Sequence, residues 1–210
     1  MRRLFVTVTL CYAWSVALAG GADTEVTYLD LQPHANQKLA EDFHVPGNTF
    51  KELPQGEQTL GGVKFKIGES AIMLAGTFLS DQPEKAEGIQ VKKAFRKLHI
   101  LHASAYGAPD GTLIGEYLVH YVDGSTEAVP VVYGEDVRDH WNKDQSKAVT
   151  RGKVAWTGEN DAVKQRNRNL RLYLTTWENP KPDQRVARID YVSKKARSAP
   201  FCIAMTVEEK

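Results

Sequence analysis

The residues best suited to chemistry in this 210-residue chain are three tryptophans, because each lies beside polar or charged neighbours. Trp141 follows Arg-Asp-His, Trp156 precedes Thr-Gly-Glu-Asn, and Trp177 precedes Glu178 and Asn179. Indole faces stack on sugar rings, and carboxylates, amides and guanidinium groups hydrogen-bond the hydroxyls around them. We therefore interpret these residues as candidates for carbohydrate binding, with Trp141 the most exposed. The alternative is that Trp156 and Trp177 fill the ends of a core.

A second concentration of polar groups precedes Trp141, in the segment Tyr-Gly-Glu-Asp-Val-Arg-Asp-His-Trp. Asp136, Arg138 and Asp139 gather charge there, beside Tyr133. Such groups can hydrogen-bond a sugar, so we include all four in the candidate site. The alternative is that the charged groups cap a turn and pair with each other.

Motifs of catalytic and metal sites are missing. The chain has no HExxH, no paired CxxC, no GxSxG and no phosphate-binding loop. His99 and His102 lie three residues apart on one expected strand, so they should face opposite sides and are poor ligands for one metal. A calcium ion held by loop carboxylates and carbonyls stays open, as does glycoside hydrolysis by loop carboxylates.

The first nineteen residues are typical of a secretory leader. Arg2 and Arg3 precede a mostly apolar run, and Ala17-Leu18-Ala19 supplies the small residues of a cleavage site. We expect cleavage after Ala19 and a secreted or periplasmic protein; a membrane anchor is the alternative. Loss of the two arginines takes the net charge from +1 to −1, so nothing in the charge favours nucleic acid or an anionic membrane.

One all-β domain is expected over residues 20–210. Its lead-in, residues 20–62, is polar and partly irregular, with a strand only at 26–31. Short apolar stretches then recur between turn signals, and we predict strands at 63–67, 71–79, 95–106, 112–123, 126–133, 153–157, 169–179, 185–193 and 200–208. Residues 112–133 should form a hairpin. Residues 136–143 and 159–167 are candidates for short helical turns. Many short strands with little helix favour a β-sandwich or barrel.

Two expectations about burial follow from the same pattern. Between residues 170 and 174 leucines alternate with Arg171 and Tyr173, so one face should be core and the other aromatic and basic. With Lys153, that second face could recognise a protein.

Removal of the leader also takes away Cys11, leaving Cys202 without a disulfide partner in an apolar run, where we expect it to be buried.

Several longer strings form a recognisable series, including YVDGSTEAVPVVYGEDVRDHW and LTTWENP, and together they occupy residues 29–39, 53–67, 97–107, 114–141, 154–160, 170–193 and 199–208. This series resembles a secreted bacterial domain family, the galactose-binding-like jelly rolls found beside bacterial glycosidases. The resemblance implies a jelly-roll β-sandwich, and such domains are commonly non-catalytic carbohydrate-binding modules.

The sequence thus predicts an exported, non-catalytic, carbohydrate-binding β-sandwich without a cofactor, apart from a possible structural calcium. Its alternatives are a protein-interaction module of the cell envelope and a glycoside hydrolase. The predicted ligand-binding residues are Tyr133, Asp136, Arg138, Asp139, Trp141, Trp156, Trp177, Glu178 and Asn179.

Overall fold

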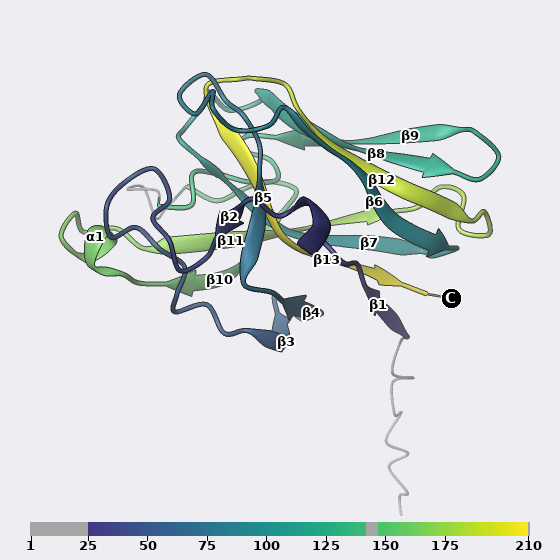
Figure 1. The fold of residues 1–210 in the computed structure, drawn as a ribbon, viewed down its shortest axis with the longest axis horizontal. Helices are drawn as coiled ribbons and strands as arrows, with labels where there is room; N and C mark the ends of the chain where they lie inside the picture. Colours follow the sequence, from purple (N-terminus) through teal and green to yellow (C-terminus); the bar gives the residue numbers. More distant parts are fainter. Residues whose placement is uncertain (1–24, 142–146, 210) are drawn as a thin grey trace, which may run out of the picture.

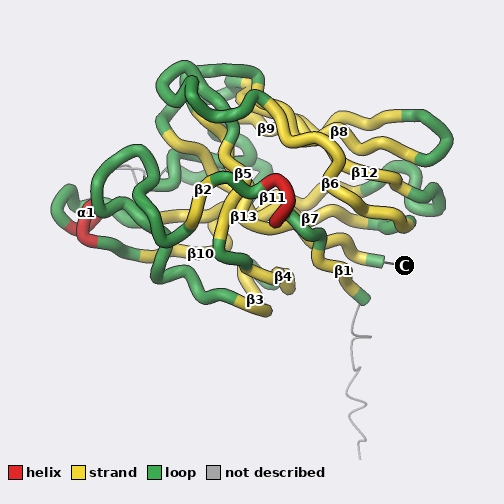
Figure 2. Tube along the Cα trace, in the orientation of Figure 1, coloured by secondary structure: helices red, strands yellow, loops and turns green. Residues whose placement is uncertain are grey.

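The computed structural model describes residues 25–141 and 147–209, and strands account for most of their regular structure (Figure 2). The predicted leader, residues 1–19, lies outside the described residues together with Cys11. Among the described residues no helix has the length and apolar character needed to cross a bilayer. The prediction of an all-β fold of antiparallel sheets is confirmed.

The larger sheet has seven strands, all antiparallel, in the order β10-β11-β7-β13-β5-β2, and β1 pairs with the far end of β13. Its strands are β1 (Val26–Tyr28), β2 (Gln37–Lys38), β5 (Ser70–Met73), β7 (Lys97–Ala105), β10 (Lys153–Gly158), β11 (Leu170–Glu178) and β13 (Ala199–Glu208). The long pairing of β7 with β13, from Lys97 opposite Glu208 to Ala105 opposite Ala199, forms its centre.

The smaller sheet has four strands in the order β6-β12-β8-β9. They are β6 (Lys85–Lys93), β8 (Leu113–Tyr121), β9 (Thr126–Val132) and β12 (Val186–Ser193). The predicted hairpin at 112–133 is confirmed, because β8 and β9 pair antiparallel across a tight turn. Gly124 supports that turn with a φ of 88°, a left-handed conformation that glycine adopts at little cost.

The two sheets pack face to face, and aromatic side chains fill the space between them. Tyr117 of β8 and Tyr191 of β12 stack with ring centroids 4.3 Å apart, and both are fully buried. His102 reaches this layer from β7, where its Nε2 lies 2.9 Å from the Thr175 hydroxyl. Cys202 is also buried, as predicted. This inner layer is the core of the sandwich.

The lead-in covers the opposite face of the seven-stranded sheet and forms a third layer (Figure 1). The lead-in contains the short 3-10 turn η1 (Gln32–His34) and ends with β3 (Gly56–Leu60), which forms a hairpin with β4 (Val63–Ile67) directly after it. Phe43 and Phe50 pack against Phe201 of β13, with ring centroids 5.3 Å and 5.8 Å away. The larger sheet is therefore buried on both faces, which explains the nearly continuous apolar sequence of β13.

Burial of both sides of β11 overturns its predicted exposed face. Tyr173 is 1% exposed and Arg171 is 7% exposed, because their side of the strand faces the interior of the sandwich, where Thr175 meets His102 and Asp136. Lys153 alone of that group is exposed. The face therefore offers no aromatic surface to a protein partner.

Several predicted boundaries were also wrong. Strands β2, β3 and β6 were not predicted, and the strand expected at 71–79 ends at Met73. The described part of the predicted helical turn at 136–143 consists of turns and isolated bridges, while residues 142 and 143 lie outside the described residues. The second helical turn exists but is short, as α1 (Asp161–Lys164).

Candidate functional site

The nine residues predicted to bind carbohydrate lie in three separate parts of the molecule. Five belong to the segment after β9, namely Tyr133, Asp136, Arg138, Asp139 and Trp141. Trp156 lies on β10 opposite Leu172, whereas Trp177 is five residues further along β11 and is followed by Glu178 and Asn179. Five residues of strand span about 17 Å, so one sugar ring cannot stack on both tryptophans.

Asp136 is fully buried and is held by an arginine from outside its own segment. Its carboxylate accepts hydrogen bonds from the Val132 amide at 2.7 Å and from Nε of Arg151 at 2.7 Å, and Nη2 of Arg151 pairs with it as well. The Thr175 hydroxyl donates a longer bond of 3.4 Å. A buried charge needs such partners, so Asp136 fixes the turn after β9 to the sheet.

Arg138 is buried beside Asp136 but pairs elsewhere. Its guanidinium donates to both carboxylate oxygens of Asp110, at 2.8 Å and 3.1 Å, and to the Ala148 carbonyl. These bonds, with Lys147, lower the pKa of the Asp110 carboxyl to about 2. Arg138 therefore ties two loops together, and its donors are used within the protein.

Asp139 and Trp141 lie deeper than the sequence suggested. Trp141 is 8% exposed, whereas Trp156 and Trp177 are half-buried, so the prediction that Trp141 is the most exposed tryptophan was wrong. The Asp139 amide donates to the Tyr133 hydroxyl at 3.3 Å. Burial of the Asp139 carboxyl raises its pKa to about 7.

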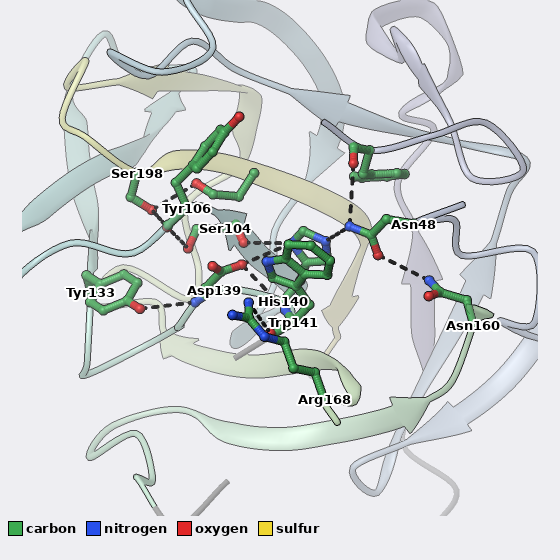
Figure 3. A network of polar contacts seen from close by, with 12 residues as sticks. Asn48, Ser104, Tyr106, Tyr133, Asp139, His140, Trp141, Asn160, Arg168 and Ser198 are labelled. Atoms are coloured by element: carbon green, nitrogen blue, oxygen red, sulfur yellow. Dashed lines mark hydrogen bonds and ion pairs between the residues drawn. The ribbon is translucent and has the colours of Figure 1, made fainter. Parts of the chain in front are cut away.

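His140, between those two residues, is the centre of a buried polar network that joins four segments (Figure 3). Its backbone N–H donates a 2.8 Å hydrogen bond to the Ser104 carbonyl of β7, and its carbonyl accepts one from the Arg171 amide of β11. Its ring nitrogens lie 3.1 Å from the Ser104 carbonyl and 2.8 Å from Nδ2 of Asn48. Neither β7 nor the lead-in is near His140 in the sequence, so this site follows from the fold.

The donors and acceptors of the network fix the protonation state of His140. The Val163 amide must donate to Oδ1 of Asn160, so Nδ2 of Asn160 donates to the Thr49 carbonyl and to Oδ1 of Asn48. Nδ2 of Asn48 is then a donor, and Nε2 of His140 must accept from it. The proton of the neutral ring therefore sits on Nδ1. Burial, with His44 nearby, lowers the pKa of His140 to about 3.

The same network builds one wall of a surface cavity of about 440 Å³ at the end of β10, here called the Trp156 groove. Residues 47–54 of the lead-in form one side, and residues 156–161 with Lys164 form the other. Asn160, which caps the first turn of α1, joins the two sides through its bonds to Asn48 and Thr49. The walls are thus held in place before any ligand binds.

Gly158 fixes the orientation of Trp156 in this groove. A methyl group on Gly158 would lie 2.1 Å from Cη2 and 2.3 Å from Cζ2 of the indole, so the six-membered ring lies directly over the Gly158 backbone. The Phe50 ring supports the indole from the core side, with centroids 6.0 Å apart. The indole is half-buried, and its remaining surface lines the groove.

Polar side chains surround Trp156 in the groove. Glu52, Glu159 and Asp161 supply carboxylates, and Lys51 and Lys164 supply ammonium groups; the closest pair of these, Lys164 and Glu159, is 3.3 Å apart and exposed. The Thr49 hydroxyl is buried and has no hydrogen-bond partner within the described residues. An aromatic face bordered by mixed hydrogen-bonding groups is the arrangement that sugars require.

Trp177 belongs to a different environment. Its ring packs against Phe95 at a centroid distance of 6.4 Å, and Glu178 and Asn179 border a smaller cavity of about 290 Å³. The Asn179 amide is buried, donates to the Phe95 carbonyl and accepts from the Tyr121 hydroxyl. Asn179 therefore fixes the corner after β11.

Metal ligands do not converge in the described part of the chain: residues 25–141 and 147–209 contain no group of three His, Cys, Asp or Glu side chains arranged around one point. The structural calcium ion that the sequence left open gains no support from these side chains.

The sequence reading missed the residues that organise the site, chiefly His44, Asn48, His140 and Asn160. The turn residues Pro46-Gly47-Asn48 and the helix-capping pattern Asn160-Asp161 were visible signals, but each indicates only local structure.

Comparison with protein-family models, with curated proteins and with solved structures gave no match.

Proposed function

We propose that this protein is an exported, non-catalytic carbohydrate-binding module with a jelly-roll β-sandwich of the galactose-binding-like type, and that the Trp156 groove holds the sugar. The observation that carries the proposal is the Trp156 indole, which lies over Gly158 and borders a polar cavity. A pyranose ring placed on the free surface of the indole would have carboxylate, amide and ammonium groups within its reach.

The groove suits a neutral saccharide better than an acidic one. Three carboxylates border it against two ammonium groups, and Lys164 already faces Glu159. An added carboxylate or sulfate would meet net negative charge, whereas sugar hydroxyls can donate to the carboxylates. Because residues 47–54 are tied to Asn160 and His140, little ordering is needed on binding.

The test is a screen of the exported chain against a panel of neutral and acidic glycans, followed by titration of the best ligand with two matched variants. Trp156→Ala should weaken binding by about tenfold or more, because it removes the stacking face. Trp177→Ala is the control, since it deletes an equally half-buried indole at the other end of β11.

Gly158→Ala provides a second perturbation that leaves the indole in the chain but displaces it. It should weaken binding as Trp156→Ala does. The urea midpoint of both variants is measured together with the affinity, to separate loss of binding from loss of folding. Loss of binding in Trp177→Ala with Trp156→Ala unaffected would move the site to the other end of β11. Absence of any saturable glycan would refute the proposed function.

A further inference from the structure

A continuous series of aromatic rings joins the surface near β5 to the buried network, and nothing in the proposed sugar site uses it. The centroids of Phe78 and Tyr106 are 5.4 Å apart, those of Tyr106 and His44 are 4.6 Å apart, and those of His44 and Trp141 are 5.3 Å apart. Phe78 is 54% exposed, so one end of the series is open to solvent.

Arginines stack at both ends of this series. The Arg197 guanidinium lies 5.0 Å from the centroid of Phe78, and those of Arg168 and Arg166 lie 4.8 Å and 5.5 Å from the centroid of Trp141. Arg166 and Arg197 are exposed and Arg168 is half-buried. Stacking on a ring leaves the edge of a guanidinium, with its N–H groups, free to meet a ligand.

Within the described residues, these three arginines differ from the ion-paired arginines of the fold, although the charge of Arg168 still acts on the Asp139 carboxyl, whose pKa it lowers against the effect of burial. Arg96, Arg138 and Arg151 each pair with a carboxylate. Among residues 25–141 and 147–209, no carboxylate forms an ion pair with Arg166, Arg168 or Arg197. The hydrogen bonds of Arg166 and Arg168 go to the main-chain carbonyls of Ala162 and Trp141.

Unsatisfied polar atoms lie along the same series. Both ring nitrogens of His44 are buried without a hydrogen-bond partner, and so is Nε of Arg168, counting partners within the described part of the chain. Buried donors and acceptors in native proteins normally have partners, so each exception calls for an explanation, such as a bound water, an ion or a ligand. Both residues, His44 and Arg168, pack against Trp141.

We propose that this arginine–aromatic band, formed by the ring series from Phe78 to Trp141 and by Arg166, Arg168 and Arg197, binds an anionic polysaccharide. The guanidinium edges would hold carboxylate or sulfate groups, for which their planar, two-pronged geometry is suited. The exposed Phe78 face would contact a sugar ring. The band is separate from the Trp156 groove, whose charge favours neutral saccharides, and the inference does not depend on that groove.

A sparse set of cations favours a polysaccharide over a nucleic acid. Nucleic acid carries one charge per 3.4 Å of each strand and is bound by proteins with a strongly basic surface, whereas this chain has a net charge of only +1. Three guanidinium groups stacked on rings match a polymer that presents sugar-ring faces beside its charged groups, as an acidic polysaccharide does.

The test measures affinity for heparin, by equilibrium titration and by the NaCl concentration needed for elution from a heparin column. The informative variant is Arg166→Gln combined with Arg197→Gln, which removes one exposed cation from each end of the band. Its matched control is Lys85→Gln combined with Arg185→Gln, which makes the same change in net charge at two exposed residues, one at the start of β6 and one directly before β12. Dextran serves as the neutral polymer.

We expect the band variant to weaken heparin binding by about tenfold and to elute at lower salt, the control variant to stay within twofold of the native protein, and dextran not to bind. Phe78→Ala should also weaken binding, and Trp156→Ala should leave it unchanged. Equal losses in the band and control variants would overturn the proposal, because binding would then follow net charge alone. Tighter binding of a thirty-nucleotide oligothymidine than of heparin at 150 mM NaCl would overturn it as well.

Discussion

Acidification should destabilise this protein through His140. The neutral ring fits its surroundings, since Nδ1–H donates to the Ser104 carbonyl and Nε2 accepts from Asn48. Protonation would put a second N–H against the Asn48 amide group, which is itself a donor. Burial therefore lowers the pKa of His140 to about 3, compared with 6.5 for an unperturbed histidine.

The size and direction of the effect follow from proton linkage. As the pH falls below 6.5, the unfolded chain takes up a proton at His140 and the folded chain does not, so the free energy of unfolding falls. The loss continues until the pH approaches 3, where the folded ring is protonated too. With a pKa of about 3 in the folded chain and 6.5 in the unfolded chain, the free energy of unfolding falls by about 3 kcal/mol between pH 7 and pH 4.

The assay is urea unfolding of the native protein and of His140→Gln, followed by tryptophan fluorescence at pH 7, 5.5 and 4. Glutamine does not titrate, so the variant should be less stable than the native protein at pH 7, and the difference should shrink by about 3 kcal/mol at pH 4. Asp139, whose pKa is raised to about 7, changes the free energy of unfolding in the opposite direction. Between pH 3.8 and 7 the folded chain holds the Asp139 proton more tightly than the unfolded chain does, so this residue stabilises the fold as the pH falls. Both proteins keep Asp139, so this effect largely cancels in the difference. Parallel stability curves for the two proteins would refute the neutral, buried role of His140.

Three further predictions concern the packing of the sandwich. Arg151→Ala should lower the free energy of unfolding by about 3 kcal/mol in urea titrations, because it leaves the Asp136 carboxylate buried without its cation; a change below 1 kcal/mol would contradict this. Gly76→Ala should cost about 1–3 kcal/mol in the same assay, because the new methyl group would lie 2.9 Å from backbone atoms of Ala199, and an unchanged midpoint would show that the two segments can separate. Cys202, whose pKa is raised to about 12 by burial, should react with a thiol reagent such as DTNB at pH 8 only after unfolding, and rapid labelling of the native protein would refute that burial.

Strands were predictable from the sequence where apolar residues form a clear run or alternate beside turn residues. The hairpin of β8 and β9 is one case, since Asp123-Gly124-Ser125 separates two such strands. Strand β6 was missed although Ala86, Ile89 and Val91 are buried, because charged side chains and Gly88 separate them along an edge strand. Strand β3 contains no buried residue, so its sequence carries no core signal.

The candidate site was less predictable because its parts meet only in the fold. Asp136 and Arg138 were predicted to bind the ligand or, alternatively, to pair within their own segment, but their partners, Arg151 and Asp110, lie on other segments. Trp141 lies in a polar stretch and is nevertheless buried, because the rings of His44 and His140 pack against it. A tryptophan among charged residues in a sequence is therefore not necessarily exposed.

The buried network also explains how the Trp156 groove and the arginine–aromatic band can coexist in a small sandwich. His140 contacts Asn48, which positions the groove through Asn160, and its ring is nearly parallel to that of Trp141, on which Arg166 and Arg168 stack. A change at His140 therefore reaches both surfaces and cannot distinguish them. To separate the two proposed functions, substitutions must be made at exposed side chains of the groove or of the band. Those side chains belong to one surface only, whereas His140 and its partners support both.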